Sequence, residues 1–222
     1  MLFRSATMYE CIVFDLDGTL LDTLEDLADS VNFALQKNGL PLRTIEEVRS
    51  FVGNGIKNLM ERAVGAEHQE YAEQALKDFK AHYKLHCADK TKAYDGIIPL
   101  LKQLKERGIA LAVLSNKADF AVKDLSKRYF GNLLDEAMGE NESAGVRKKP
   151  APDALFSVVE KLGKDKNKTL YVGDSEVDIQ TANNANMPCI SVTWGFKDKE
   201  FLMKNGATHY ADTPQDILKF IE

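Results

Sequence analysis

Residues 11–19 have the sequence CIVFDLDGT, in which a four-residue apolar run leads directly into a short acidic segment. An apolar run of this length is typical of a strand that is buried on both faces of a parallel sheet. Three similar runs follow at residues 109–114, 169–172 and 189–192, and helical patterns separate them. The repeated strand–helix–strand order predicts an α/β fold with a doubly wound parallel sheet.

The stretch between the first two runs differs, because it contains helical patterns and no strand pattern. Five apolar residues have the spacing of one helix face: Leu24, Leu27, Ala28, Val31 and Leu35. Thr44 and Glu47 have the spacing of a capping box at the start of another helix. We therefore expect a smaller all-helical cap domain over residues 23–92, inserted after the first strand. The core would then consist of residues 1–22 and 93–222.

Polar side chains follow three of the four predicted strands. Asp15 and Asp17 come after the first strand, Ser115 and Asn116 after the second, and Asp174 after the third. In open α/β sheets, ligands bind in the crevice outside the carboxyl ends of the strands. We therefore expect these side chains to meet at one edge of the sheet.

Four carboxylates would converge at this edge, because Asp178 lies one helical turn after Asp174. Two like charges about 4 Å apart repel each other by on the order of 4 kcal/mol at an effective dielectric of about 20, so a cation is needed among them. Oxygen ligands without histidine or cysteine favour Mg²⁺. Asp174 suits direct ligation, whereas Asp178 suits pairing with a lysine or supporting a ligand. Taken alone, residues 17–19 would also fit a simple turn and helix cap.

Ser115 and Asn116 precede a predicted helix, where a hydroxyl and exposed backbone N–H groups form an anion site. Either residue could instead cap that helix, and the two roles are compatible. Lys149 offers a cation that would offset the repulsion between a phosphate and a carboxylate nucleophile. The neighbouring basic residues 147–148 fit a solvated surface.

Composition excludes several classes of protein. The 222 residues carry a net charge of −5, which gives no general attraction to nucleic acid or to an anionic membrane. No apolar run reaches the roughly 18 residues of a membrane span. Three widely spaced cysteines argue against a disulfide framework, so we expect a cytoplasmic protein. The oligomeric state stays open between a monomer and a homodimer. Met8 is an alternative start, since the first strand begins just after it.

In this order and spacing, the four polar segments resemble the haloacid dehalogenase superfamily of phosphatases over essentially the whole chain. Residues 15–23, DLDGTLLDT, are the most specific part of the resemblance. The resemblance implies an aspartyl-phosphate mechanism in which Asp15 attacks phosphorus and Asp17 moves the proton. Asn186 stands where such sequences usually have glycine, and asparagine tolerates left-handed geometry nearly as well.

The resemblance also implies how a phosphate and a metal are bound. The phosphoryl group would be held by Ser115, the Asn116 backbone and Lys149. The ligands of Mg²⁺ would be Asp15, the Asp17 carbonyl oxygen and Asp174.

Residues 51–55, FVGNG, and the helix that follows them are similar to the cap of bacterial phosphoglycolate phosphatases. This implies a small phosphorylated metabolite as substrate, with 2-phosphoglycolate as the first candidate. The backbone of Gly53, Asn54 and Gly55 would approach the substrate, and Arg62 would meet its carboxylate. Alternatively, the glycines only join two cap helices.

Two other functions fit part of the pattern. A phosphosugar mutase of the β-phosphoglucomutase type would share nearly every catalytic residue, although Thr19 and the cap segment favour hydrolysis. A phospho-acceptor signalling module would also use carboxylates, Mg²⁺, a hydroxyl and a lysine. Such modules are about half as long and have no helical insert, which favours an enzyme here.

Overall fold

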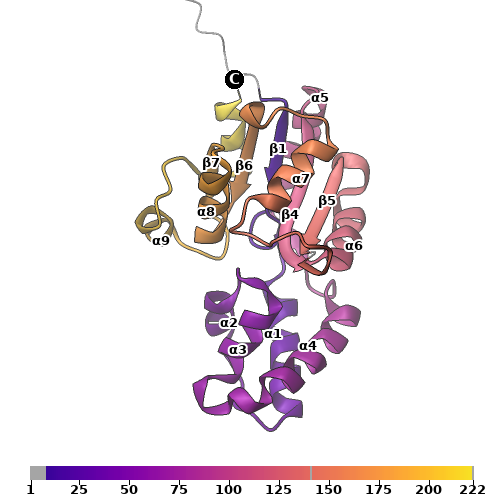
Figure 1. Ribbon diagram of the computed structural model, residues 1–222, viewed down its shortest axis with the longest axis vertical. Coiled ribbons are helices and arrows are strands. Elements are labelled where there is room, and N and C mark those ends of the chain that lie inside the picture. Colours follow the sequence, from indigo (N-terminus) through magenta and orange to yellow (C-terminus); the bar gives the residue numbers. More distant parts are fainter. Residues whose placement is uncertain (1–8, 141, 222) are drawn as a thin grey trace, which may run out of the picture.

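The computed structural model describes residues 9–140 and 142–221, so Met8 lies outside the described residues. Two units follow one another along the long axis of the molecule (Figure 1). One is a sheet between layers of helices, and the other is a group of helices beyond one end of that sheet. This is the α/β fold with a smaller helical unit that the sequence predicts. Within the described residues, no helix is both long and apolar enough to cross a bilayer.

The sheet has six parallel strands in the order β5-β4-β1-β6-β7-β8. Their bounds are β1 (Cys11–Phe14), β4 (Ala110–Ala118), β5 (Glu136–Glu140), β6 (Thr169–Gly173), β7 (Cys189–Val192) and β8 (Tyr210–Ala211). The four predicted apolar runs form β1, β4, β6 and β7. Phe14 at the end of β1 pairs with Val113 on one side and Val172 on the other. The residues that follow Phe14 therefore emerge at the centre of the sheet edge.

Alternate residues of β1 are buried on opposite faces of the sheet. Ile12 and Phe14 pack against α5 and α6, whereas Cys11 and Val13 pack against α7 and α8. Burying one large apolar side chain contributes about 1.5–3 kcal/mol, so both faces hold β1 in place. The helices of this unit are α5 (Ile97–Glu106), α6 (Asp119–Phe130), α7 (Asp153–Lys161), α8 (Glu176–Ala185) and α9 (Lys199–Lys204). Its 3₁₀ segments are η2 (Gly131–Leu133), η3 (Glu142–Ala144), η4 (Lys166–Lys168) and η5 (Pro214–Phe220).

The helical unit, which we call the cap, has an apolar core of its own that includes Val31, Met60 and Phe79. The predicted capping box is present: Thr44 Oγ1 accepts the Glu47 N–H at 3.2 Å, and Glu47 Oε2 accepts the Thr44 N–H at 2.7 Å. Its elements are α1 (Leu24–Lys37), α2 (Ile45–Phe51), α3 (Gly55–Val64), η1 (Ala66–Tyr71) and α4 (Ala72–His86).

The chain enters and leaves the cap through two short strands that pair with each other. β2 (Leu21–Asp22) and β3 (Lys92–Ala93) form an antiparallel ribbon. Just beyond the ribbon, the buried Asp26 carboxylate accepts the N–H groups of Lys90 and Thr91 at 3.0 and 2.8 Å. These bonds join the first turn of α1 to the returning chain, so the two crossing points lie side by side.

Candidate active site

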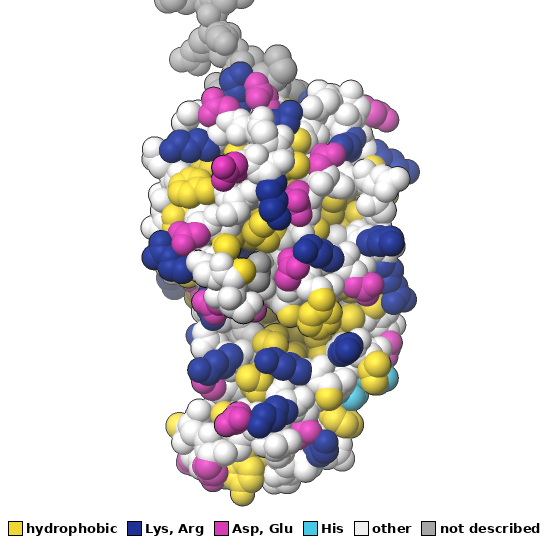
Figure 2. Space-filling view, turned by 45° about the vertical axis from the view of Figure 1, so that its right-hand side comes forward, with side chains coloured by type: hydrophobic (Ala, Val, Ile, Leu, Met, Phe, Trp, Pro, Cys, Tyr) yellow, Lys and Arg dark blue, Asp and Glu magenta, His cyan; other side chains and the backbone are white. Residues whose placement is uncertain are grey.

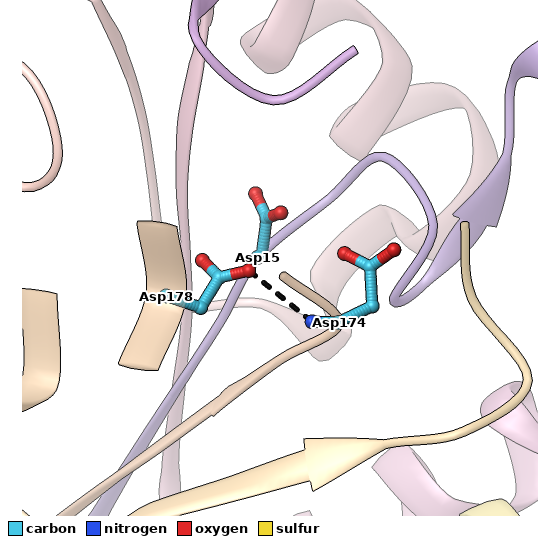
Figure 3. A group of neighbouring side chains, drawn as sticks. All are labelled: Asp15, Asp174 and Asp178. Carbon is cyan, nitrogen blue, oxygen red and sulfur yellow. Dashed lines mark hydrogen bonds between the residues drawn. The ribbon is translucent and has the colours of Figure 1, made fainter. Parts of the chain in front are cut away.

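Three buried carboxylates meet where β1 and β6 end. Asp15 follows β1, Asp174 follows β6, and Asp178 comes from the first turn of α8 (Figure 3). One oxygen from each of the three side chains lies within 4.8 Å of the others. Burial and the Asp178 carboxylate raise the pKa of Asp15 to about 7, and burial and Asp15 raise the pKa of Asp174 well above its usual value. The buried carboxylates therefore outnumber the positive charges beside them, and their all-oxygen donors fit a hard divalent cation.

Two glycines press closely on Asp174. A Cβ atom at Gly18 would lie 2.2 Å from Asp174 Oδ2, and one at Gly195 would lie 2.5 Å from the same oxygen. That oxygen also accepts the Phe196 N–H at 2.7 Å. The absence of side chains at both glycines thus lets two backbone segments enclose one carboxylate. The Gly18 segment belongs to the predicted acidic motif, so the motif shapes the site as well as supplying its acids.

Lys149 provides the buried cation on the other side of Asp15. Its Nζ lies 2.9 Å from Asp15 Oδ1, 2.8 Å from Asp178 Oδ1 and 3.1 Å from the Tyr171 hydroxyl. Burial lowers the pKa of Lys149, but the Asp15 and Asp178 carboxylates outweigh it and raise that pKa well above its usual value. Asp178 thus pairs with a lysine, one of the two roles that its position in the sequence suggests. Its other oxygen accepts the backbone N–H groups of Asp174 and Ser175, at 3.2 and 3.1 Å.

Ser115 and Asn116, near the end of β4, contact different parts of the site. Ser115 Oγ donates to Asp17 Oδ2 at 3.3 Å. Asn116 faces the Lys149 segment, where its side chain donates to the Lys149 carbonyl oxygen and accepts the Lys149 N–H at 3.0 and 2.9 Å. Asn116 Nδ2 also lies 3.3 Å from the carbonyl oxygen of Gly53 in the cap. Ser115 therefore positions Asp17, and Asn116 positions Lys149, both from the end of β4.

Two of the three cap residues predicted to approach the substrate, Gly53 and Gly55, lie at the site, whereas Asn54 does not. Gly53 and Gly55 line a cavity of about 50 Å³ together with Asp15, Asp17, Ser115, Asn116, Lys149 and Asp174. Asn54 precedes α3, and its carbonyl oxygen accepts the Asn58 side chain at 2.9 Å; it does not line this cavity. Arg62 is exposed and donates to the Phe51 carbonyl oxygen at 3.1 Å. It lines a separate surface hollow, because α3 carries it seven residues, about 10 Å, beyond Gly55.

Residues 12–192 match the family of haloacid dehalogenase-like hydrolases. The chain is a haloacid dehalogenase-like hydrolase. Its sequence is 36% identical over 194 residues to the phosphoglycolate phosphatase of Pseudomonas savastanoi pv. phaseolicola, covering 83% of this chain and 70% of that protein. It is also 36% identical over 192 residues to the phosphoglycolate phosphatase of Agrobacterium fabrum, covering 84% of this chain and 81% of that protein.

A solved structure has the same fold as this haloacid dehalogenase-like hydrolase. It is a Lactobacillus delbrueckii subsp. bulgaricus protein provisionally named phosphoglycolate phosphatase, with a TM-score of 0.91 and 36% sequence identity. The match covers 96% of this chain and 98% of the other. The similarity therefore extends over the sheet and the cap together.

Two residues of the hydrolase site have no role in the interpretation of the sequence. Lys117 is buried and places Nζ 2.5 Å from Asp17 Oδ1 and 2.7 Å from the hydroxyl of Tyr83, which belongs to α4 in the cap. Burial raises the pKa of Asp17, but Lys117 outweighs it and holds that pKa below its usual value. A spacing of two residues from Ser115 is the sequence signal for Lys117, since both side chains contact Asp17. Nothing in the local sequence points to Tyr83, because its contact crosses between the two units.

Proposed function

We propose that this hydrolase is a Mg²⁺-dependent phosphatase that removes the phosphoryl group of a small phosphorylated metabolite, 2-phosphoglycolate first among them, through an aspartyl-phosphate. The observation that carries the proposal is the placement of Asp15, which lies beside the Lys149 ammonium and opens onto a small cavity at the sheet edge. A carboxylate paired with one buried cation, beside a second acid, fits nucleophilic attack on a phosphate. The names of the relatives support the choice of substrate.

The residues would divide the reaction between them. A carboxylate oxygen of Asp15 attacks phosphorus, the bond from phosphorus to the substrate oxygen breaks, and Asp17 gives the leaving oxygen its proton. Water then attacks the same phosphorus, Asp17 takes a proton from that water, and the bond to Asp15 breaks to release phosphate. Lys149 offsets charge on the phosphoryl oxygens, and Ser115 with the Asn116 backbone positions them.

The residues that would hold Mg²⁺ are Asp15, the Asp17 carbonyl oxygen and Asp174. The side chains of Asp15 and Asp174 belong to the buried carboxylate cluster, whose oxygen donors suit this cation. Bound there, the cation supplies charge neutralisation at the phosphoryl group. We further propose a cytoplasmic enzyme, monomeric or homodimeric, without a nucleic-acid or membrane partner. The free thiols of Cys11, Cys87 and Cys189 support a reducing compartment.

The test is phosphate release from 2-phosphoglycolate by the full chain, with EDTA and with Mg²⁺ added back. We expect many turnovers per chain, loss of activity in EDTA and recovery with Mg²⁺. Release that stops near one phosphate per chain would refute turnover and favour a phospho-acceptor module. Interconversion of β-glucose 1-phosphate and glucose 6-phosphate without net phosphate release would favour the mutase instead.

A further inference from the structure

The catalytic cavity is too small for a whole substrate. Its volume is about 50 Å³, and the catalytic side chains form its wall on the core side. Pockets for small molecules usually measure roughly 300–1,000 Å³. A phosphoryl group next to Asp15 would therefore occupy most of this space, and the alcohol part of the substrate must extend out of it.

A larger cleft begins where the catalytic cavity ends. It measures about 450 Å³ and shares Gly55, Ile56, Asn116 and Lys117 with the catalytic cavity. One wall is a single face of α4 in the cap, since its residues follow helical spacing: Leu76, Phe79, Lys80, Tyr83 and Lys84. The opposite wall comes from the core and includes Phe120, which is 60% exposed. The alcohol part of a bound substrate would extend into this cleft.

The cleft is rich in positive charge although the chain carries a net charge of −5. Five lysines line it against two glutamates: Lys57, Lys80, Lys84, Lys117 and Lys148 against Glu140 and Glu142. Figure 2 shows lysine and arginine side chains above and below a hydrophobic patch at the junction of the two units. A local positive field on an acidic protein attracts anions to that place.

Lys80 and Lys84 differ from the other three lysines. Lys117 pairs with Asp17, Lys148 lies 3.6 Å from Glu142, and Lys57 lies 3.8 Å from Glu61. Lys80 and Lys84 form no ion pair with any described residue. They lie four residues apart on one helix, a spacing at which like charges destabilise the helix. This arrangement leaves two ammonium groups free to bind an anion in the cleft.

We propose that this cleft is a second anion-binding subsite, in which Lys80 and Lys84 bind a carboxylate at the far end of the substrate's alcohol part. The substrate class is that of phosphorylated hydroxy acids, with room for acids longer than glycolate. This proposal rests on the proposed phosphatase function, because the phosphoryl group must be held at Asp15 for its alcohol part to lie in the cleft.

Two esters of equal length provide the test: 3-phosphoglycerate ends in a carboxylate, whereas glycerol 3-phosphate ends in a neutral alcohol. We expect the full chain with Mg²⁺ to have a higher kcat/KM for 3-phosphoglycerate. The double variant Lys80→Gln/Lys84→Gln should lower the ratio of the two kcat/KM values roughly tenfold, mainly through KM. Added salt should lower the ratio for the unmodified chain in the same direction.

Matched variants separate the subsite from a general effect of charge. Lys77→Gln removes a lysine of α4 that lies outside the cleft and pairs with Glu73, so it should leave the ratio unchanged. Lys80→Arg/Lys84→Arg should retain the ratio, since the charge is kept. The subsite is refuted if the unmodified chain does not favour 3-phosphoglycerate, if the double glutamine variant keeps its ratio, or if Lys77→Gln shifts the ratio equally. If p-nitrophenyl phosphate is still hydrolysed, any of these results refutes the subsite alone and the phosphatase proposal is retained. If no ester is hydrolysed, both proposals are refuted.

Discussion

Lys117 and Asp17 form a buried ion pair, with Nζ 2.5 Å from Oδ1. The same oxygen accepts the hydroxyl of Thr23 at 2.6 Å, in the segment that leads from β2 into α1. Lys117 in turn donates to the hydroxyl of Tyr83 in the cap, at 2.7 Å. Asp17, which we assign to proton transfer, is thus held by Lys117 from the core and by Thr23 from the start of the cap. Lys117 links it further to Tyr83 in the cap. An ionised Asp17 cannot donate a proton, so its pairing with Lys117 must weaken when Asp17 acts as an acid.

Lys117→Met should raise the pKa of Asp17, because the attraction of the ammonium is lost while burial remains. The limb of the pH–rate profile that reflects Asp17 should then move to higher pH. The measurement is kcat/KM for p-nitrophenyl phosphate from about pH 4 to about pH 9. Lys123→Met is the control, since Lys123 is an exposed lysine that pairs with Asp119 on α6. A Lys117→Met profile that superimposes on the unmodified one would contradict the assignment.

Asp15→Asn should lower kcat by at least about 10⁴-fold, because the nucleophile is lost while its volume is kept. The fold should be retained, since the substitution removes one of three crowded carboxylates. Circular dichroism and single-turnover phosphate release with 2-phosphoglycolate check both points. Asp212→Asn, at a side chain that is 64% exposed, is the matched control and should keep full activity. Repeated turnover by Asp15→Asn would rule out its role as nucleophile.

The metal-free protein should lose stability as pH rises from about 4 to about 7. Asp15 has its pKa raised to about 7 in the folded state, so between these values the folded chain holds a proton that the unfolded chain has released. Thermal unfolding in EDTA should therefore give a higher Tm at about pH 5 than at about pH 7.5, and Asp15→Asn should reduce this difference. Mg²⁺ should raise Tm more at the higher pH, because it binds deprotonated carboxylates. The opposite pH trend in EDTA would show that Asp15 does not carry the raised pKa.

Gly18→Ala should lower activity by displacing Asp174, in addition to straining the backbone at residue 18. Gly18 has φ +82° and its added Cβ would lie 2.2 Å from Asp174 Oδ2, whereas Gly108 has φ +76° and open space around it. Left-handed strain costs both variants about 1–2 kcal/mol of unfolding free energy. Only Gly18→Ala must also displace Asp174, so we expect its kcat to fall at least about 100-fold while Gly108→Ala stays active. Equal activity in the two variants would mean that the enclosure of Asp174 is unimportant.

Much of the sheet could be predicted from the sequence, because a strand buried on both faces needs an unbroken apolar run. The edge strand β5 escaped prediction since it has the sequence EAMGE and is only partly buried. β8 has two residues, too few for any pattern. The left-handed geometry considered for Asn186 is present, with φ 55° after α8. The sequence therefore predicts a strand of this sheet only where its apolar run is long enough to recognise.

The site could be predicted as far as it depends on strand ends. Asp15 and Asp174 come together because parallel strands deliver their carboxyl ends to one edge. Lys149 lies in the segment between β5 and α7, where the Asn116 side chain binds its backbone N–H and carbonyl oxygen. The cap contacts could not be predicted in the same way, since they depend on how two separately packed units face each other. Tyr83 reaches Lys117 across that junction, whereas Arg62 lies at the far end of α3 and away from the cavity.

The paired strands β2 and β3 have a consequence for how such enzymes diversify. Leu21 faces Ala93 and Asp22 faces Lys92, so the whole helical insert is attached through two adjacent points of the backbone. Its apolar core is largely separate from that of the sheet, and the reacting acids lie outside it. Exchange of the insert at these two junctions would replace α4 and its lysines, and with them Thr23 and Tyr83. Asp15, which we propose as the nucleophile, would keep its partner Lys149 in the core. Selection for new metabolites can therefore act on one exchangeable module while the carboxylate cluster stays on the other.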